Sequence, residues 1–136
     1  MNRLSGTVVR CEKNGHAALV VIRVGAIDLS AVLIGSFDAG GLPQAGAAVT
    51  ALFKESETAL CLDVAAHALS IRNRLACRIT AVEDDGILAR VDLDFDGRPL
   101  RSLITSDAAH DLRAAVGMAI NALVKSTEVL VETGSA

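Results

Sequence analysis

Aromatic side chains are scarce in this chain, which has three phenylalanines, no tyrosine and no tryptophan among its 136 residues. Proteins that bind single-stranded nucleic acid stack the bases on aromatic rings, so the composition argues against this class. Basic charge is also limited, because 13 lysines and arginines stand against 16 acidic residues, for a net charge of −3. The chain lacks the basic surface that binding to a nucleic-acid duplex needs, and we expect no nucleic-acid partner.

Cysteine motifs and long apolar runs are missing as well. Cys11, Cys61 and Cys77 form no CxxC pair and have no ligand-like spacing to the three histidines, so we expect neither a disulfide framework nor a metal-cation site. The N-terminal residues enter a strand-like pattern at once, and no apolar stretch approaches the roughly 20 residues that a membrane helix needs. These absences predict a reduced, cytoplasmic protein that does not insert into a membrane.

The sequence repeats itself without a gap at an offset of 71 residues. Aligned identical pairs include Asn2 with Asn73, Gly15 with Gly86, Gly46 with Gly117, and Lys54 with Lys125. Most other aligned positions keep apolar residues opposite apolar residues. The repeat predicts two copies of a unit of about 65 residues. They occupy residues 1–62 and 69–136 and are joined by the segment near residues 63–69.

Within each unit the apolar residues recur with a period of two. In the second unit, apolar residues alternate with charged ones over residues 89–95, which predicts a strand with one buried face. Turn residues follow at 96–99, and further strands are predicted at 100–105, 120–125 and 129–132. Residues 106–115 do not alternate and predict a short helix with Ser106 or Asp107 as its N-cap. The pattern indicates an all-β protein of two tandem OB-fold-like, five-stranded antiparallel barrels, each with one short helix.

Hydroxyl and cationic side chains gather at predicted strand ends in the second unit. They are Ser70, Arg72 and Asn73, then Thr105 and Ser106, and then Lys125 and Ser126. Such groups suit a small oxyanion, because hydroxyls and amides donate to its oxygens while Lys or Arg offsets its charge. Hydroxyls at strand ends are also common without any ligand, so the residue types alone leave a structural role open.

Three short motifs of the second unit resemble the molybdate-binding Mop module, also called a TOBE domain. They are the S-x-R-N opening at residues 70–73, the Ile104-Thr105 pair and the segment at 123–126. The resemblance covers residues 69–132, and the repeat extends it to nearly the whole chain. Tandem modules of this kind occur in stand-alone molybdate-binding proteins, in molybdate-responsive transcription regulators and at the end of the ATPase subunit of molybdate transporters.

The resemblance implies a non-enzymatic protein that binds molybdate or tungstate at subunit interfaces, as an intracellular store, buffer or sensor without an organic cofactor. Carried over residue by residue, the oxyanion ligands would be Ser70, Arg72, Asn73, Thr105, Ser106, Lys125 and Ser126. Self-association into a dimer or trimer is implied too. The alternative is that the chain serves as the regulatory or dimerisation module of a molybdate transporter ATPase or a molybdate-responsive regulator.

The first unit departs from the family pattern. Met1 stands opposite Arg72, so the S-x-R-N opening is truncated. Lys54 is followed by Glu55, whose carboxylate would repel a dianion. We therefore expect the first unit to be mainly structural, with Lys54 and Ser56 as secondary anion contacts.

Two other groups of polar residues have simpler interpretations. The aspartates at 92, 94 and 96 alternate along one strand and diverge from any common point, so we interpret them as a solvated face rather than a calcium site. His110 has Asp107 and Asp111 nearby, but no serine or cysteine has the sequence context of a nucleophile. We interpret His110 as a surface residue and expect no enzymatic activity.

Overall fold

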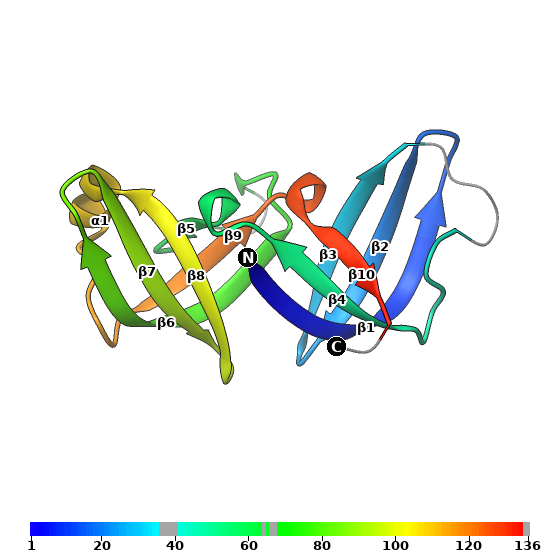
Figure 1. Ribbon diagram of the computed structural model, residues 1–136, viewed down its shortest axis with the longest axis horizontal. Coiled ribbons are helices and arrows are strands. Elements are labelled where there is room, and N and C mark those ends of the chain that lie inside the picture. Colours follow the sequence, from blue (N-terminus) through cyan, green and yellow to red (C-terminus); the bar gives the residue numbers. More distant parts are fainter. Residues whose placement is uncertain (36–40, 64, 66–67, 135–136) are drawn as a thin grey trace.

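The computed structural model describes residues 1–35, 41–63, 65 and 68–134, and these form two five-stranded antiparallel sheets side by side along the long axis (Figure 1). The first four strands are β1 (Asn2–Lys13), β2 (Ala17–Val24), β3 (Ile27–Ile34) and β4 (Ala48–Phe53). Their counterparts in the second half are β6 (Asn73–Asp84), β7 (Leu88–Phe95), β8 (Arg98–Thr105) and β9 (Ala119–Val124). The remaining elements are the short strands β5 (Ala59–Cys61) and β10 (Leu130–Thr133), the 3₁₀ turns η1 (Glu55–Glu57) and η3 (Ser126–Glu128), and the helix α1 (Ser106–Leu112). The predicted all-β fold is confirmed.

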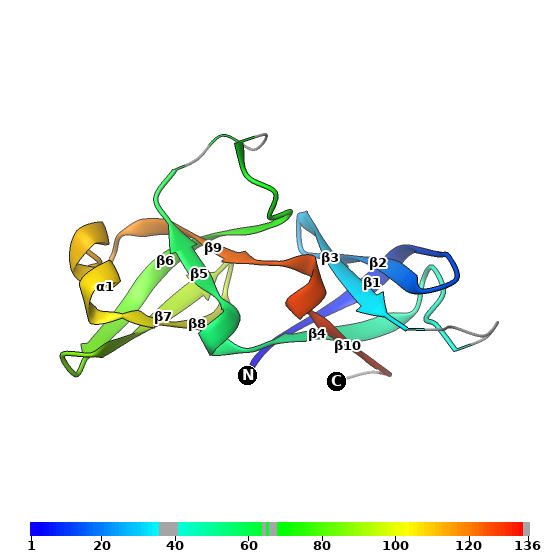
Figure 2. The same ribbon diagram turned by 90° about the horizontal axis from the view of Figure 1, so that it is seen from above.

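Each sheet takes its fifth strand from the other half of the chain. β10 pairs with β4 in the sheet β10-β4-β1-β2-β3, and β5 pairs with β9 in the sheet β5-β9-β6-β7-β8. Figure 1 shows β10 alongside β4, and Figure 2 shows β5 beside β9. The predicted units 1–62 and 69–136 are therefore sequence repeats, but neither segment completes a sheet of its own. Sequence periodicity does not reveal this exchange, because an edge strand makes the same backbone hydrogen bonds whichever half supplies it.

Both halves share the same backbone irregularity near the middle of their long first strands. The pairing of β1 with β2 shifts register just after Val8, and that of β6 with β7 just after Ile79. The amide of Gly46 donates to the carbonyl of Val8, and the amide of Gly117 to that of Ile79, both at 2.8 Å. These two glycines have φ of +90° and +91°, a conformation that strains any side chain with a Cβ. Their alignment in the repeat thus marks one backbone turn that occurs twice.

The buried apolar side chains of the two halves form one hydrophobic cluster. The predicted alternation is confirmed in β7, where Ala89, Val91, Leu93 and Phe95 are all buried. All three cysteines are free thiols, and burial raises the pKa of the Cys77 thiol to about 11. This thiol packs as a small apolar side chain, as its sequence context indicates.

Two buried asparagines hold the halves together. The side-chain oxygen of Asn73 accepts from the Ser30 amide, and its Nδ2 donates to the Ser30 carbonyl, both at 2.8 Å. Asn2, the residue aligned with Asn73, makes the same two bonds with the main chain of Arg101, also at 2.8 Å. Each side-chain amide thereby acts as a strand partner for the edge of β3 or β8, which would otherwise present unpaired backbone groups.

The short helix of the second half begins at Ser106, the first residue of the predicted segment, and ends at Leu112, but its N-cap differs from the prediction. The N-cap of α1 is Thr105 rather than Ser106 or Asp107, because the Thr105 hydroxyl accepts from the Ala108 amide at 3.1 Å. The corresponding segment of the first half includes residues 36–40, so the short helix predicted there lies outside the described residues, as do residues 64, 66 and 67 of the predicted linker. In the described part of the chain, no helix is long and apolar enough to cross a membrane.

We expect Asn73→Ala to lower the free energy of unfolding by about 2–4 kcal/mol, because it leaves the half-buried amide and carbonyl of Ser30 without the buried partner that pairs with both. Urea denaturation followed by circular dichroism measures the change, since the chain has no tryptophan. The control is Asn121→Ala, which removes one peripheral bond to the Leu62 carbonyl and should cost less than about 1 kcal/mol. Equal losses in the two variants would contradict the assigned role of Asn73.

Candidate functional site

Ser30, Asn73 and Ser126 come together where the two halves meet, in a cluster that we call the Ser30 junction. The Ser30 hydroxyl lies 2.7 Å from the Ser126 hydroxyl and donates to the side-chain oxygen of Asn73 at 3.2 Å. β3 supplies Ser30, the start of β6 supplies Asn73, and η3 supplies Ser126. Asn73 is buried and the two serines are half-buried. The junction thus offers paired hydroxyls at a site partly withdrawn from water.

The Ser30 junction joins two residues predicted from the sequence, Asn73 and Ser126, with one that was not predicted. Ser30 lies inside a strand of the first half, and its aligned residue is Arg101, so the repeat gives no hint of its position. Only the Nδ2 group of Asn73 could donate to an anion, and it already uses one of its two hydrogens for the Ser30 carbonyl, so a single hydrogen remains.

Two exposed cations, Arg72 and Lys125, flank the junction in sequence. Arg72 donates to the carbonyls of Leu69 at 2.5 Å and Ser70 at 3.3 Å, which holds its guanidinium against the segment that enters β6. Lys125 is the N-cap residue of η3, and no side chain caps that turn. The first amides of η3 therefore remain as donors beside the Ser126 hydroxyl.

Lys125 also lines a surface groove of about 350 Å³ that contains Ser56 and Ile71. The groove brings Lys125 together with Ser56, one of the two secondary contacts predicted in the first half. Glu57 and Glu128 line the same groove, and their carboxylates oppose an anion there. Lys125 is therefore the cation in a groove whose two carboxylates oppose an anion.

Thr105 and Ser106 lie elsewhere, at the start of α1 near the outer end of the second half, away from η3 (Figure 1). The Thr105 hydroxyl already caps the helix. The buried Ser106 hydroxyl donates to the Asp84 carboxylate at 3.0 Å, and His110 Nε2 lies 3.0 Å from the same oxygen. Within one chain, the structure does not bring these two predicted residues to the Ser30 junction.

The Asp84 carboxylate links the start of α1 to the turn between β6 and β7 through hydrogen bonds. Hydrogen bonds from the Gly86 amide, at 2.8 Å, and from the Ser106 hydroxyl hold the pKa of Asp84 below its ordinary value, and His110 lowers it further. The His110 side chain is 71% exposed, which agrees with its interpretation as a surface residue. Among the described residues, no group of three His, Cys, Asp or Glu side chains is close enough to hold a metal ion.

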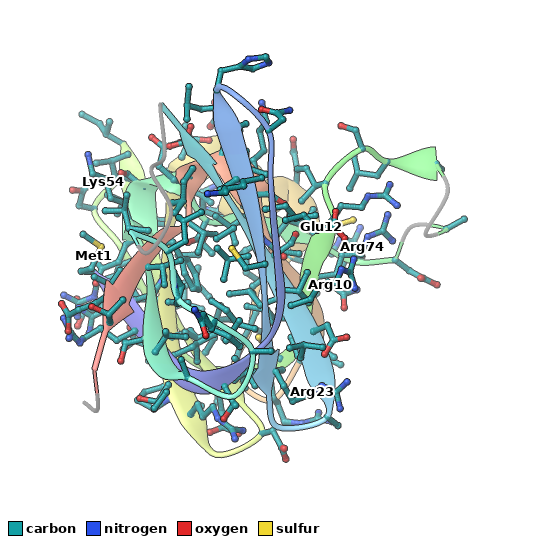
Figure 3. All side chains as sticks on the ribbon, turned by 90° about the vertical axis from the view of Figure 1, so that its right-hand side faces the viewer. Met1, Arg10, Glu12, Arg23, Lys54 and Arg74 are labelled. Atoms are coloured by element: carbon teal, nitrogen blue, oxygen red, sulfur yellow. The ribbon has the colours of Figure 1, made fainter. Side chains whose placement is uncertain are left out.

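An equivalent cluster lies where Asn2 and Glu55 of the first half meet Arg101 of the second half. We call these three residues the Arg101 junction. Glu55 aligns with Ser126, and its Oε1 lies 3.7 Å from Arg101 Nη1. Lys54 precedes Glu55 as Lys125 precedes Ser126. Figure 3 shows Lys54 and Met1 on one side of the molecule and Arg74 on the other.

Comparison with known proteins shows what this chain is similar to. Residues 69–131 match the family model of the TOBE domain. This confirms the family that the motifs at residues 70–73, 104–105 and 123–126 indicated.

Individual relatives are similar over different lengths. The molybdenum import ATP-binding proteins ModC of Brucella abortus, Brucella suis and Brucella melitensis are 42% identical over 64 residues, which is 46% of this chain. The match spans only 18% of the length of those relatives. The cytoplasmic molybdate-binding protein ModG, solved with molybdate bound, matches with a TM-score of 0.90 and 27% identity, over 98% of this chain and 96% of that chain. The fold of this chain, with both its halves, is thus that of ModG.

We expect Asp84→Asn to lower the thermal midpoint at pH 7, because it removes the negative charge and leaves one acceptor oxygen where two now serve Gly86 on one side and Ser106 and His110 on the other. Because the pKa of Asp84 is lowered in the folded protein, the ionised carboxylate stabilises the fold fully above the ordinary aspartate pKa of about 3.9. This stabilisation is lost as the pH falls through the lowered pKa. The difference from wild type should therefore vanish in strong acid. Melting curves by circular dichroism from pH 7 downwards test this.

The matched control for this prediction is Asp111→Asn, which removes an exposed carboxylate from the same helix. It should leave the midpoint nearly unchanged at every pH. If the thermal midpoint of Asp84→Asn stayed below that of wild type by the same amount in strong acid, the assigned role of the ionised carboxylate would be contradicted.

Proposed function

We propose that this protein binds molybdate or tungstate and acts as a cytoplasmic store, buffer or sensor of molybdenum. The observation that carries the proposal is the similarity to the molybdate-binding protein ModG over both halves of the chain. The paired hydroxyls of the Ser30 junction, flanked by Arg72 and Lys125, support it from the chemistry of the residues. The function is binding rather than catalysis and requires no organic cofactor.

A tetrahedral dianion is held best by several short, charge-assisted hydrogen bonds in a partly dry site. Each of the Ser30 and Ser126 hydroxyls could donate to such an ion by turning its one hydrogen away from its present partner, and the first amides of η3 add fixed donors. Lys125 and Arg72 supply the positive charge. Because the whole chain carries a net charge of −3, the attraction for the dianion is local to these two residues.

We propose that a second copy of the chain completes the site. Thr105 and Ser106, two of the ligands that the resemblance implies, lie at the outer end of the second half rather than at the Ser30 junction. Beside them, Ile87 is 78% exposed and Leu88 is 42% exposed, and such apolar surface favours contact with another subunit. In a dimer or trimer, the outer end of one copy would meet the junction side of the next, which places the oxyanion at the subunit interface.

We expect wild-type protein to bind molybdate saturably in isothermal titration calorimetry. Lys125→Ala should weaken binding by about ten- to a hundredfold, the effect of losing one charge-assisted hydrogen bond. Lys54→Ala is the matched control, because it removes the aligned lysine beside Glu55 and should change the affinity by less than about twofold.

Two results would overturn this proposal. One is the absence of saturable binding, or binding of sulfate with the same affinity as molybdate. The other is an equal loss of affinity in Lys125→Ala and Lys54→Ala, which would remove the assigned difference between the two halves.

A second candidate function is the regulatory module of a transporter ATPase. It is favoured by the 42% identity with the ModC proteins, which is higher than the 27% identity with ModG. An immunoblot of an extract from the source cells separates the two candidates. A polypeptide of 14.1 kDa supports the stand-alone binding protein, and a much larger one supports the regulatory module.

A further inference from the structure

The two junctions are built on one backbone arrangement. In both, an asparagine at the start of a long strand makes two hydrogen bonds of 2.8 Å to the main chain of the other half, at Ser30 or at Arg101. In both, a 3₁₀ turn follows a lysine and brings its first residue to the same place, Ser126 or Glu55. The junctions therefore differ mainly in the side chains that face each other on this shared frame.

Those side chains give the two junctions opposite electrostatic character. At the Ser30 junction, two neutral hydroxyls face each other at 2.7 Å. At the Arg101 junction, Arg101 Nη1 faces Glu55 Oε1 at 3.7 Å, and Arg101 Nε donates to Asp92 at 2.7 Å. A carboxylate thus stands beside a guanidinium at the position where the other junction has a hydroxyl.

The Arg101 junction also contains open space. A cavity of about 420 Å³ is lined by residues that include Asn2, Arg3, Glu55, Asp92 and Arg101. The Glu55 side chain is 32% exposed, so its carboxylate lies at the wall of this cavity and is not packed into the core. The cavity holds cationic side chains, and Glu55 and Asp92 offset their charge.

We propose that the Arg101 junction is a latent second oxyanion site, kept closed by Glu55. The Glu55 carboxylate takes the place of an anion beside Arg101, and its charge repels any dianion that enters the cavity. Without that charge, the cationic groups at the cavity are Arg101, Arg3 and the N-terminal amine of Met1, which now pairs with Glu55 at 3.4 Å. The carboxylates that remain are Asp92, beside Arg101, and Glu132, which pairs with Arg3 at 3.0 Å. This inference rests on the proposed function, because it assigns to the first half the same ligand chemistry.

The test is Glu55→Ser, which installs the residue that the second half has at the aligned position. We expect titration with molybdate to show one more bound anion per chain than in wild type, with the affinity of the original site unchanged. In the double variant with Lys125→Ala, the new site should remain while binding at the original site is weakened. Circular dichroism confirms that each variant is folded, and Glu55 lies half-buried in the 3₁₀ turn η1, where the aligned residue of the second half is already a serine.

The matched control is Glu12→Ser, which removes the same charge and also breaks an ion pair, with Arg10 at 3.2 Å. Figure 3 shows Glu12 and Arg10 on the side of the molecule away from Met1 and Lys54. This control should add no molybdate site. A gain equal to that of Glu55→Ser would show a general effect of net charge and would overturn the proposal.

The outcomes separate this inference from the proposed function. If wild type binds molybdate and Glu55→Ser binds the same number of anions per chain, the proposal of a latent site is wrong and the proposed function stands. If wild type does not bind and Glu55→Ser does, the latent site is supported and the proposed function fails. If neither protein binds molybdate, both are wrong.

Discussion

The reciprocal exchange of edge strands is the constraint on which the rest of the structure depends. β10 completes the first sheet and β5 completes the second, so neither half satisfies its own backbone hydrogen bonds without the other. The side-chain amides of Asn2 and Asn73 continue this exchange where the strands end, by pairing with the edges of β8 and β3. Residues at the two junctions are therefore positioned by hydrogen bonds from both halves at once.

The two halves have the same backbone arrangement at their junctions but different side chains there. The backbone turn at Gly46 and Gly117 and the asparagine pairs recur in both halves, because they maintain the sheets. The side chains that face each other across the junctions have no such constraint. One junction has two serines, and the other has an arginine and a glutamate. The proposed difference in oxyanion binding between the two junctions rests on this difference in charge.

The candidate site could be predicted only in part. Ser126 and Asn73 were found because the motifs mark strand ends, and they do meet in the structure. Ser30 could not be found, because a serine inside a strand carries no local signal. Thr105 and Ser106 share the family motif, yet hydrogen bonds commit them to the start of α1 and to Asp84. A motif thus identifies residues that share a role in a family, without showing which of them meet within one chain.

The sequence by itself determined the repeat, the alternation of buried and exposed residues along each strand, and the glycines that turn the backbone. These features are local, since each depends on a residue and its near neighbours in the chain. Only the tertiary structure decided which half supplies each fifth strand, which side chains meet at each junction, and that Glu55 stands beside Arg101. Those features depend on contacts between residues about a third of the chain apart or more, and such contacts leave no periodic trace in the sequence.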